Sequence, residues 1–307
     1  MGDEYLWDRT GEPDAGIVRL EAVLGRYRYR RSRRRPGPLM LAAAVAAGLV
    51  VAAVLWVGRP PLSDWRMDGK RVAVGQTVQT GAAGGAKLEA PFFGEVELGA
   101  DGELQVLGGS NGNQRLALRR GTMRALIWAP PTSFRVDTPS AQTIDLGCSY
   151  TLTVLADDSG VLTVQTGWVA FQSGARESFI PAGAVCHTRA GVGPGVPYFA
   201  SASRGVQEGV ARFEASGGRD GVPEIAAGAE RRDALTLWHL VSRTSGGDRE
   251  LVVGRLAALV PGVDAAALRV GDREALDRAW NLLGLGETEW WRMWKRTFPN
   301  PAPDRRR

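Results

Sequence analysis

The alternation of apolar and polar residues divides the chain into regions, and the first of them is a long apolar run. Leu39 to Gly58 carry no charged or strongly polar side chain over 20 positions. A helix of that length spans about 30 Å, which is the thickness of the hydrocarbon core of a bilayer. The run therefore predicts a transmembrane helix over 39–58 and a single-pass membrane protein.

The charges on the two sides of this run predict its orientation. Seven arginines lie between Arg26 and Arg35, whereas the residues after Gly58 mix basic side chains with Asp64 and Asp68. Under the positive-inside rule, the N-terminus is cytoplasmic and the bulk of the chain lies outside. A cleaved signal peptide is the alternative, although such a peptide has a shorter apolar core and a much shorter leading segment.

The N-terminal segment 1–35 has the pattern of one amphipathic helix, expected over about 14–27. Pro13 and Asp14 form a helix-start signal, and apolar residues follow at helical spacing. An isolated helix of this length is marginal in water, so we expect its apolar face to bind a partner. The expected partner-binding residues are Trp7, Ile17, Leu20 and Leu24. A solvated tail that only fixes topology and a helix lying on the membrane surface stay open as alternatives.

Residues 60–200 predict an all-β domain. Short runs alternate apolar and polar residues with a period of two, and turn pairs such as Asp101-Gly102 separate them. Strands are expected at 87–89, 95–98, 103–106, 115–118, 134–137, 150–154 and 168–171. Many short strands at this spacing are typical of a sandwich, a barrel or a β-solenoid, and the pattern alone does not choose among them.

From 201 to 298 the apolar period changes to 3.6, which predicts a small α-helical module. Four helices are expected, each beginning with an acidic residue, over 233–241, 248–260, 272–283 and 287–298. The final stretch, 299–307, is rich in proline and arginine and is expected to be disordered.

Aromatic residues crowd one face of the last expected helix. Trp290 and Trp294 are four residues apart, and Trp291 flanks them. This face either packs against Trp280 and Leu283 inside the module or binds a partner in the cell envelope, because exposed tryptophans are typical binding hot spots. Both possibilities stay open.

Charge and motif content exclude several classes of function. The formal net charge is +5, but the arginines of 26–35 and 305–307 supply more than this, so the rest of the chain is net negative and no direct nucleic-acid binding is expected. The sequence has no GxSxG, HExxH, phosphate-binding loop or dinucleotide fingerprint, and it has only two histidines. We therefore expect no catalytic residues, no cofactor and no metal, and a protein that is not an enzyme.

The chain has two cysteines, Cys148 and Cys186. In the oxidising compartment that the topology predicts, a disulfide between them is a natural candidate. Cys148 has the same strand parity as Tyr150 and Leu152, so its side chain is expected to point into the core. Two buried free thiols are the alternative, and the sequence does not decide between the two.

Motifs between 125 and 188 resemble the FecR-type domain, and the order of the motifs carries the resemblance. The matching stretches are Phe134-Arg135-Val136-Asp137-Thr138-Pro139-Ser140-Ala141, Ile144-Asp145-Leu146-Gly147-Cys148, Val164-Gln165-Thr166-Gly167-Trp168-Val169 and Ala182-Gly183. The resemblance extends over about 72–188. These residues are expected to build the fold, with Gly147 and Gly167 permitting tight bends at strand ends.

This resemblance implies a function and a location. FecR-type proteins are bacterial inner-membrane regulators whose cytoplasmic end controls an extracytoplasmic-function sigma factor, while the periplasmic domain receives a signal from another envelope protein or a ligand. The segment 1–35 is shorter than the usual N-terminal domain of the family, and the usual transducer-binding domain is not recognisable. Cys148 also stands where the family has a small polar residue. The alternative is a membrane-anchored envelope scaffold, or a glycan- or protein-binding module, without a sigma partner.

Overall fold

The computed structural model describes residues 15–25, 64–108 and 113–285. The chain divides into two compact units, Met1–Pro60 and Pro61–Arg307. Within the described ranges, no helix is both long enough and apolar enough to cross a membrane. The apolar run 39–58 and the tail 299–307 lie outside those ranges, so the single-pass topology and the disordered tail stay predictions.

The first unit contains one described helix, α2 (Ala15–Leu24). It begins directly after Asp14, where the helix-start signal placed it, and Gly25 follows its last residue. The helix lies within the expected range 14–27, and residues 14, 26 and 27 lie outside the described part of the chain. The sequence therefore predicted the presence of this helix correctly, and its full expected length stays a prediction.

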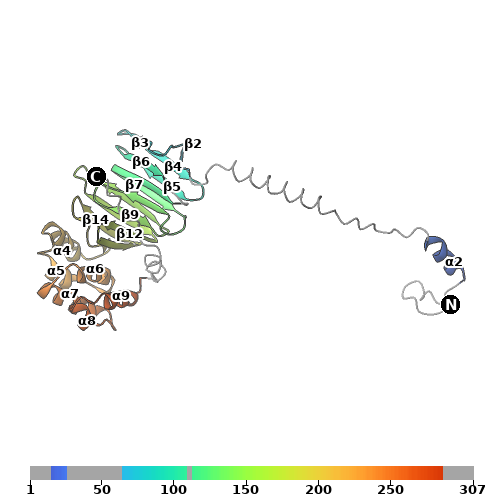
Figure 1. Cartoon of the computed structure of the whole chain (residues 1–307). Coiled ribbons are helices and arrows are strands. Elements are labelled where there is room, and N and C mark those ends of the chain that lie inside the picture. Colours follow the sequence, from blue (N-terminus) through green and yellow to red (C-terminus); the bar gives the residue numbers. More distant parts are fainter. Residues whose placement is uncertain (1–14, 26–63, 109–112, 286–307) are drawn as a thin grey trace. The chain divides into compact units, whose positions relative to one another are not determined.

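Sixteen described strands in the second unit form two sheets, which the long strand β7 (Gln114–Ile127) joins (Figure 1). In spatial order, the first sheet holds β2 (Lys70–Arg71), β1 (Arg66–Met67), β4 (Ala86–Ala90), β5 (Gly94–Leu98), the C-terminal half of β7, β10 (Ser149–Val154), β11 (Gly160–Thr166), β14 (Ala184–Arg189), and then β15 (Gly193–Pro194) and β16 (Tyr198–Phe199). The second sheet holds β3 (Thr77–Gln79), β6 (Glu103–Gly108), the N-terminal half of β7, β8 (Phe134–Asp137), β9 (Gln142–Asp145), β12 (Trp168–Ser173) and β13 (Arg176–Pro181). Among these pairings β7 and β8 run parallel, and the others are antiparallel.

A glycine allows β7 to pass from one sheet to the other. The N-terminal half of the strand pairs with β6 through residues such as Leu118, and the C-terminal half pairs with β5 from Met123 onward. Between the two halves, Gly121 has a φ of 87°, and an added Cβ would lie 2.6 Å from the Cα of Gly102. A side chain at this position would therefore be strained and would collide with the neighbouring backbone.

The inner faces of the two sheets share one hydrophobic core. Leu118, Phe134, Tyr150 and Leu152 are fully buried in it. The Trp65 ring also lies in this core, with its centroid 5.8 Å from that of Phe134. Burial alternates along β10, as the period-two pattern requires. The arrangement is that of a sandwich rather than a β-solenoid.

A small helical module follows the strands, as the sequence predicts. Its helices are α4 (Arg204–Ala215), α5 (Val222–Gly228), α6 (Ala234–Val241), α7 (Gly246–Leu259), α8 (Ala265–Arg269) and α9 (Arg273–Leu282), with a short 3₁₀ turn η2 (Arg231–Asp233) before α6 (Figure 1). Asp272 caps α9 by accepting from two backbone N–H groups of its first turn. Three of the expected helices match α6, α7 and α9 to within two residues. The expected helix 287–298 lies outside the described part of the chain.

The helices and the strands share the same core. All eight residues of α6 are buried. The ring centroid of Trp280, on α9, lies 4.8 Å from that of Trp238 on α6, 5.7 Å from that of Trp168 on β12 and 5.8 Å from that of Phe179 on β13. Because aromatic side chains contribute large apolar areas, this cluster binds the module firmly to the second sheet.

Candidate functional site

Aliphatic side chains of α2 are exposed. Leu20 and Leu24 expose 62% and 57% of their surface, and Val23 is similarly exposed. Residues 17, 20 and 24 recur at helical spacing, so their Cα atoms lie on the same side of the helix. Val18 is also exposed, at 49%, but it lies roughly 140° around the axis from the midpoint of Leu20 and Leu24. An apolar face of this kind is suited to a partner groove.

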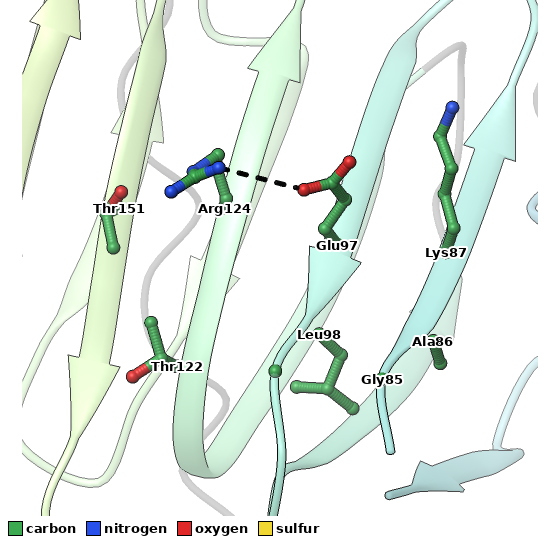
Figure 2. Close-up of a pocket in the computed structure, with 9 residues that line it drawn as sticks. Gly85, Ala86, Lys87, Glu97, Leu98, Thr122, Arg124 and Thr151 are labelled. Atoms are coloured by element: carbon green, nitrogen blue, oxygen red, sulfur yellow. Dashed lines mark ion pairs between the residues drawn. The ribbon is translucent and has the colours of Figure 1, made fainter. Parts of the chain in front are cut away.

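A second candidate is a shallow cavity of about 470 Å³ on the outer face of the first sheet. Figure 2 shows Arg124 of β7 reaching toward Glu97 of β5, with Thr151 on one side and Lys87 on the other. Glu97 and Arg124 are register partners, and so are Arg124 and Thr151. The cavity therefore presents charged and hydroxyl groups side by side on three paired strands.

The charges beside this cavity are already paired with one another. Arg124 Nη1 lies 4.0 Å from a Glu97 carboxylate oxygen, and Lys87 Nζ lies 2.8 Å and 3.0 Å from the carboxylates of Glu89 and Glu95. Hydrogen bonds to Glu89 and then Glu95 raise the pKa of Lys87. Exposed pairs of this kind contribute little to stability, so they are available for exchange with a polar ligand.

Exposed aromatic residues border the same sheet. Phe92, in the hairpin between β4 and β5, exposes 62% of its surface, and Trp128, just after β7, exposes 51%. The indole N–H of Trp128 donates to the carbonyl of Pro91 at 3.3 Å, which fixes the ring beside the hairpin. Leu126, on the outer face of β7, is about half exposed. The sequence pattern did not indicate that Trp128 lies beside the hairpin that carries Phe92.

The FecR-like motif builds a tight turn around a buried carboxyl group. Asp145 accepts from the backbone N–H of Gly147 at 2.7 Å and from the thiol of Cys148. Gly147 and Gly167 both have positive φ, and an added Cβ on Gly167 would lie 2.0 Å from the carbonyl oxygen of Gly147. Burial raises the pKa of Asp145 to about 7, and burial, followed by the Asp145 charge, raises the pKa of Cys148. The motif residues thus serve the fold.

The two cysteines are free and buried, so the candidate disulfide between Cys148 and Cys186 is not formed in this structure. Each thiol has its own polar neighbour, because Cys148 donates to Asp145 and the Cys186 sulfur lies 3.4 Å from the Gly195 carbonyl. Burial raises the pKa of Cys186 to about 12. The alternative of two buried thiols is the one that the structure has.

Some of the other predicted binding residues lie on α2, and the rest lie outside the described part of the chain. Leu20 and Leu24 lie exposed on α2, and Ile17 belongs to the same helix. Trp7 and the possible partner face Trp290, Trp291 and Trp294 lie outside the described residues.

Comparison with known proteins gives limited similarity. No family model matches the chain, and no curated protein matches it. Crystal structures of a "putative anti-sigma factor" from Parabacteroides distasonis ATCC 8503, at 1.65 and 2.50 Å resolution, each resemble part of the chain with 14% identity and a TM-score of 0.35. The similar region covers 40% of this chain and 59% of that chain. This identity and this score are too low to transfer a function.

Proposed function

We propose that this chain is a FecR-type transmembrane signalling regulator of the bacterial inner membrane. In this proposal, the cytoplasmic segment 1–35 binds an extracytoplasmic-function sigma factor through α2, and the periplasmic second unit senses a signal from an envelope protein or a ligand. The proposal assigns no catalytic role to any residue. The observation that carries it is the exposed aliphatic face of α2, which contains Leu20 and Leu24.

The energetics of this face favour a partner. A ten-residue helix is too short to be stable alone in water, so docking must also supply the free energy that orders it. Burial of Leu20 and Leu24 in a groove would contribute roughly 1.5–3 kcal/mol each. The net affinity should therefore be moderate, which suits a regulator that must release its sigma factor.

Two features of the sequence support the other parts of the proposal. The apolar run 39–58 has the length of a membrane span, and the arginines before it favour a cytoplasmic N-terminus. The FecR-like motif residues Asp145 and Gly147 follow β9, and Gly167 packs against them from the connection between β11 and β12, where a change would disturb the fold.

Co-purification of sigma factors with the tagged full chain tests the proposal. Leu20→Asp puts a charge on the aliphatic face, and we expect it to weaken sigma binding roughly 10- to 100-fold, because the burial of one leucine is lost. Val18→Asp is the matched control, since it makes the same kind of change to an exposed aliphatic residue on the other side of the same helix. It should retain binding.

Two results would contradict the proposal. If no sigma factor is recovered with the wild-type chain, the proposed regulator function is wrong. If Leu20→Asp and Val18→Asp lose binding equally, the assignment of the binding site to this face of α2 is wrong. A reporter that is active only outside the cytoplasm, fused after Thr80, tests the topology separately. It should be active, whereas a fusion after Tyr29 should be silent.

The outer face of the first sheet favours one other function, a membrane-anchored module that binds an envelope glycan. Its cavity of about 470 Å³ presents Arg124, Glu97 and Thr151, and exposed Trp128 lies near the end of the same strand β7. Trp128 does not line the cavity, but a long glycan on this face could form hydrogen bonds in the cavity and stack on the ring. Under this alternative, Trp128→Ala weakens binding to cell-wall glycan fragments and leaves sigma-factor recovery unchanged.

A further inference from the structure

A cavity of about 350 Å³ lies where the strands meet the helices of the second unit. Arg176 at the start of β13, Arg189 at the end of β14, Glu214 near the end of α4 and Arg243 just after α6 all line it. Three guanidinium groups therefore border the cavity with one carboxylate, so the positive charge is in excess.

The single carboxylate is already engaged. Glu214 accepts from the backbone N–H of Val196 at 2.8 Å through Oε1, which also lies 3.9 Å from Arg243 Nη1. Its other oxygen lies 3.7 Å from Arg176 Nη2. Glu214 thus balances part of the charge of two arginines, and it is not a partner of Arg189.

Backbone and hydroxyl oxygens hold Arg243 in place without neutralising it. Its Nη2 donates to the Ser178 hydroxyl at 2.7 Å and to the Glu177 carbonyl at 2.9 Å. Burial, and next the positive charge of Arg176, lower the pKa of Arg243 to about 10. A buried cation with incomplete charge compensation is unfavourable unless an anion approaches it.

Arg189 has no hydrogen bond or ion pair from its guanidinium to any residue that the structure describes. Its Nε is buried and lacks an acceptor. The group also borders a neighbouring cavity of about 300 Å³, whose wall includes Asp157. That carboxylate accepts from the backbone and the hydroxyl of Ser159 and forms no ion pair with Arg189. A buried guanidinium N–H without an acceptor needs a ligand or a water to satisfy it.

We propose that the cavity bordered by Arg176, Arg189 and Arg243 binds a small oxyanion with two negative charges, either a phosphate or a dicarboxylate. Its oxygens would accept from the guanidinium of Arg189, whose planar fork matches the geometry of carboxylate and phosphate groups. Such a dianion would balance the excess charge of the three arginines. The site goes beyond the proposed regulatory function, and its test needs no sigma factor.

Calorimetric titration of the purified full chain in a non-ionic detergent tests the site. The probes are inorganic phosphate and malonate, each compared with sodium chloride of equal ionic strength. Arg189→Gln should weaken binding of the effective probe at least tenfold, since it removes the guanidinium. The control is Arg212→Gln on α4, which removes an exposed guanidinium that pairs with Glu224 at 3.1 Å, and this variant should bind as the wild type does.

A variant that is expected to raise the affinity for the anion separates a role in ligand binding from a structural role. Glu214→Gln keeps an acceptor for Val196 and removes the negative charge that competes with the anion, so binding should become several-fold tighter. A merely structural role of Glu214 would not tighten binding.

Binding of phosphate alone, of malonate alone or of both supports the proposal and identifies the class of oxyanion. The proposal is overturned if neither probe binds beyond chloride, or if Arg189→Gln binds the probe as tightly as the wild type. Should Arg189→Gln fail to fold by circular dichroism, Arg189→Lys replaces it. This variant keeps the charge but loses the fork, so it should bind several-fold more weakly, and wild-type affinity would overturn the site.

Discussion

Protonation of His239 should destabilise the second unit. This side chain is fully buried on α6, where its Nε2 accepts from the backbone N–H of Phe179 at 3.0 Å. That bond requires a neutral ring, whose Nδ1–H donates to the carbonyl of Leu235 at 2.9 Å. Burial, and next the charge of Arg243, lower the pKa of His239 to about 3. A proton on Nε2 would break the contact between α6 and β13.

The sign and size of the effect follow from the two pKa values. In the unfolded chain the imidazole has a pKa near 6.5, so between pH 6.5 and about 3 the unfolded state binds a proton that the folded state excludes. The free energy of unfolding therefore falls as the pH falls through this window, by about 1.4 kcal/mol per pH unit. Between pH 7.5 and 4.5 the His239 contribution is about 2.7 kcal/mol.

Asp145 acts in the opposite direction, so the wild-type profile alone does not isolate His239. Burial raises the pKa of Asp145 from 3.8 to about 7, and between these values the folded state binds the extra proton. Acidification over this range therefore stabilises the fold through Asp145. The informative quantity is the difference in unfolding free energy between the wild type and His239→Gln, because Asp145 contributes equally to both.

Urea unfolding of the full chain, followed by tryptophan fluorescence, measures this difference at pH 7.5 and pH 4.5. Glutamine offers one donor and one acceptor but does not titrate here, so His239→Gln should be roughly 1–3 kcal/mol less stable than the wild type at pH 7.5. The gap should shrink by about 2.7 kcal/mol at pH 4.5. His187→Gln is the control, since His187 is more exposed and burial lowers its pKa less. Parallel profiles for the wild type and His239→Gln would refute the reasoning.

Three further predictions concern the FecR-like turn and the thiols. Asp145→Asn removes a carboxyl group that the fold holds protonated to about pH 7. The wild type loses stability as the pH rises toward 7 and the variant does not, so the melting temperature of the variant relative to the wild type should rise between pH 5 and pH 8, and a pH-independent difference would contradict this. Thiol titration should find two reactive groups after denaturation without reductant and almost none in the native chain, whereas none after denaturation would indicate a disulfide. Gly167→Ala should lower the melting temperature by more than Gly174→Ala, because both positions have positive φ but only the first has a neighbouring backbone atom in the way; equal melting temperatures would exclude this clash.

Local pattern was sufficient to predict much of the fold. The period-two alternation around Tyr150 became β10, with alternate side chains in the core, and the capping residue Asp272 marked the start of α9. The same pattern left the choice between sandwich and solenoid open. That choice depends on Gly121, where β7 crosses from one sheet to the other. A single glycine between two alternating runs is not enough to predict such a bend from the sequence.

The candidate sites were less accessible from the sequence. Leu20 and Leu24 could be recognised as a helix face because their spacing is local. Arg176, Arg189 and Arg243 lie at β13, at β14 and just after α6, and the docking of α6 against β13 helps to bring them to one cavity. Their convergence depends on long-range packing, which single-sequence periodicity does not contain.

Transcript profiling of cells that carry a chromosomal Leu20→Asp substitution tests the central claim, control of a sigma factor through α2, most directly. If α2 holds or activates a sigma factor, one set of genes that shares a sigma-dependent promoter should change together in Leu20→Asp cells, and Val18→Asp cells should match the wild type. Membrane levels of each variant are measured alongside by immunoblot. Equal protein levels with no coherent change in any such gene set, or the same change in both variants, would contradict the regulator function.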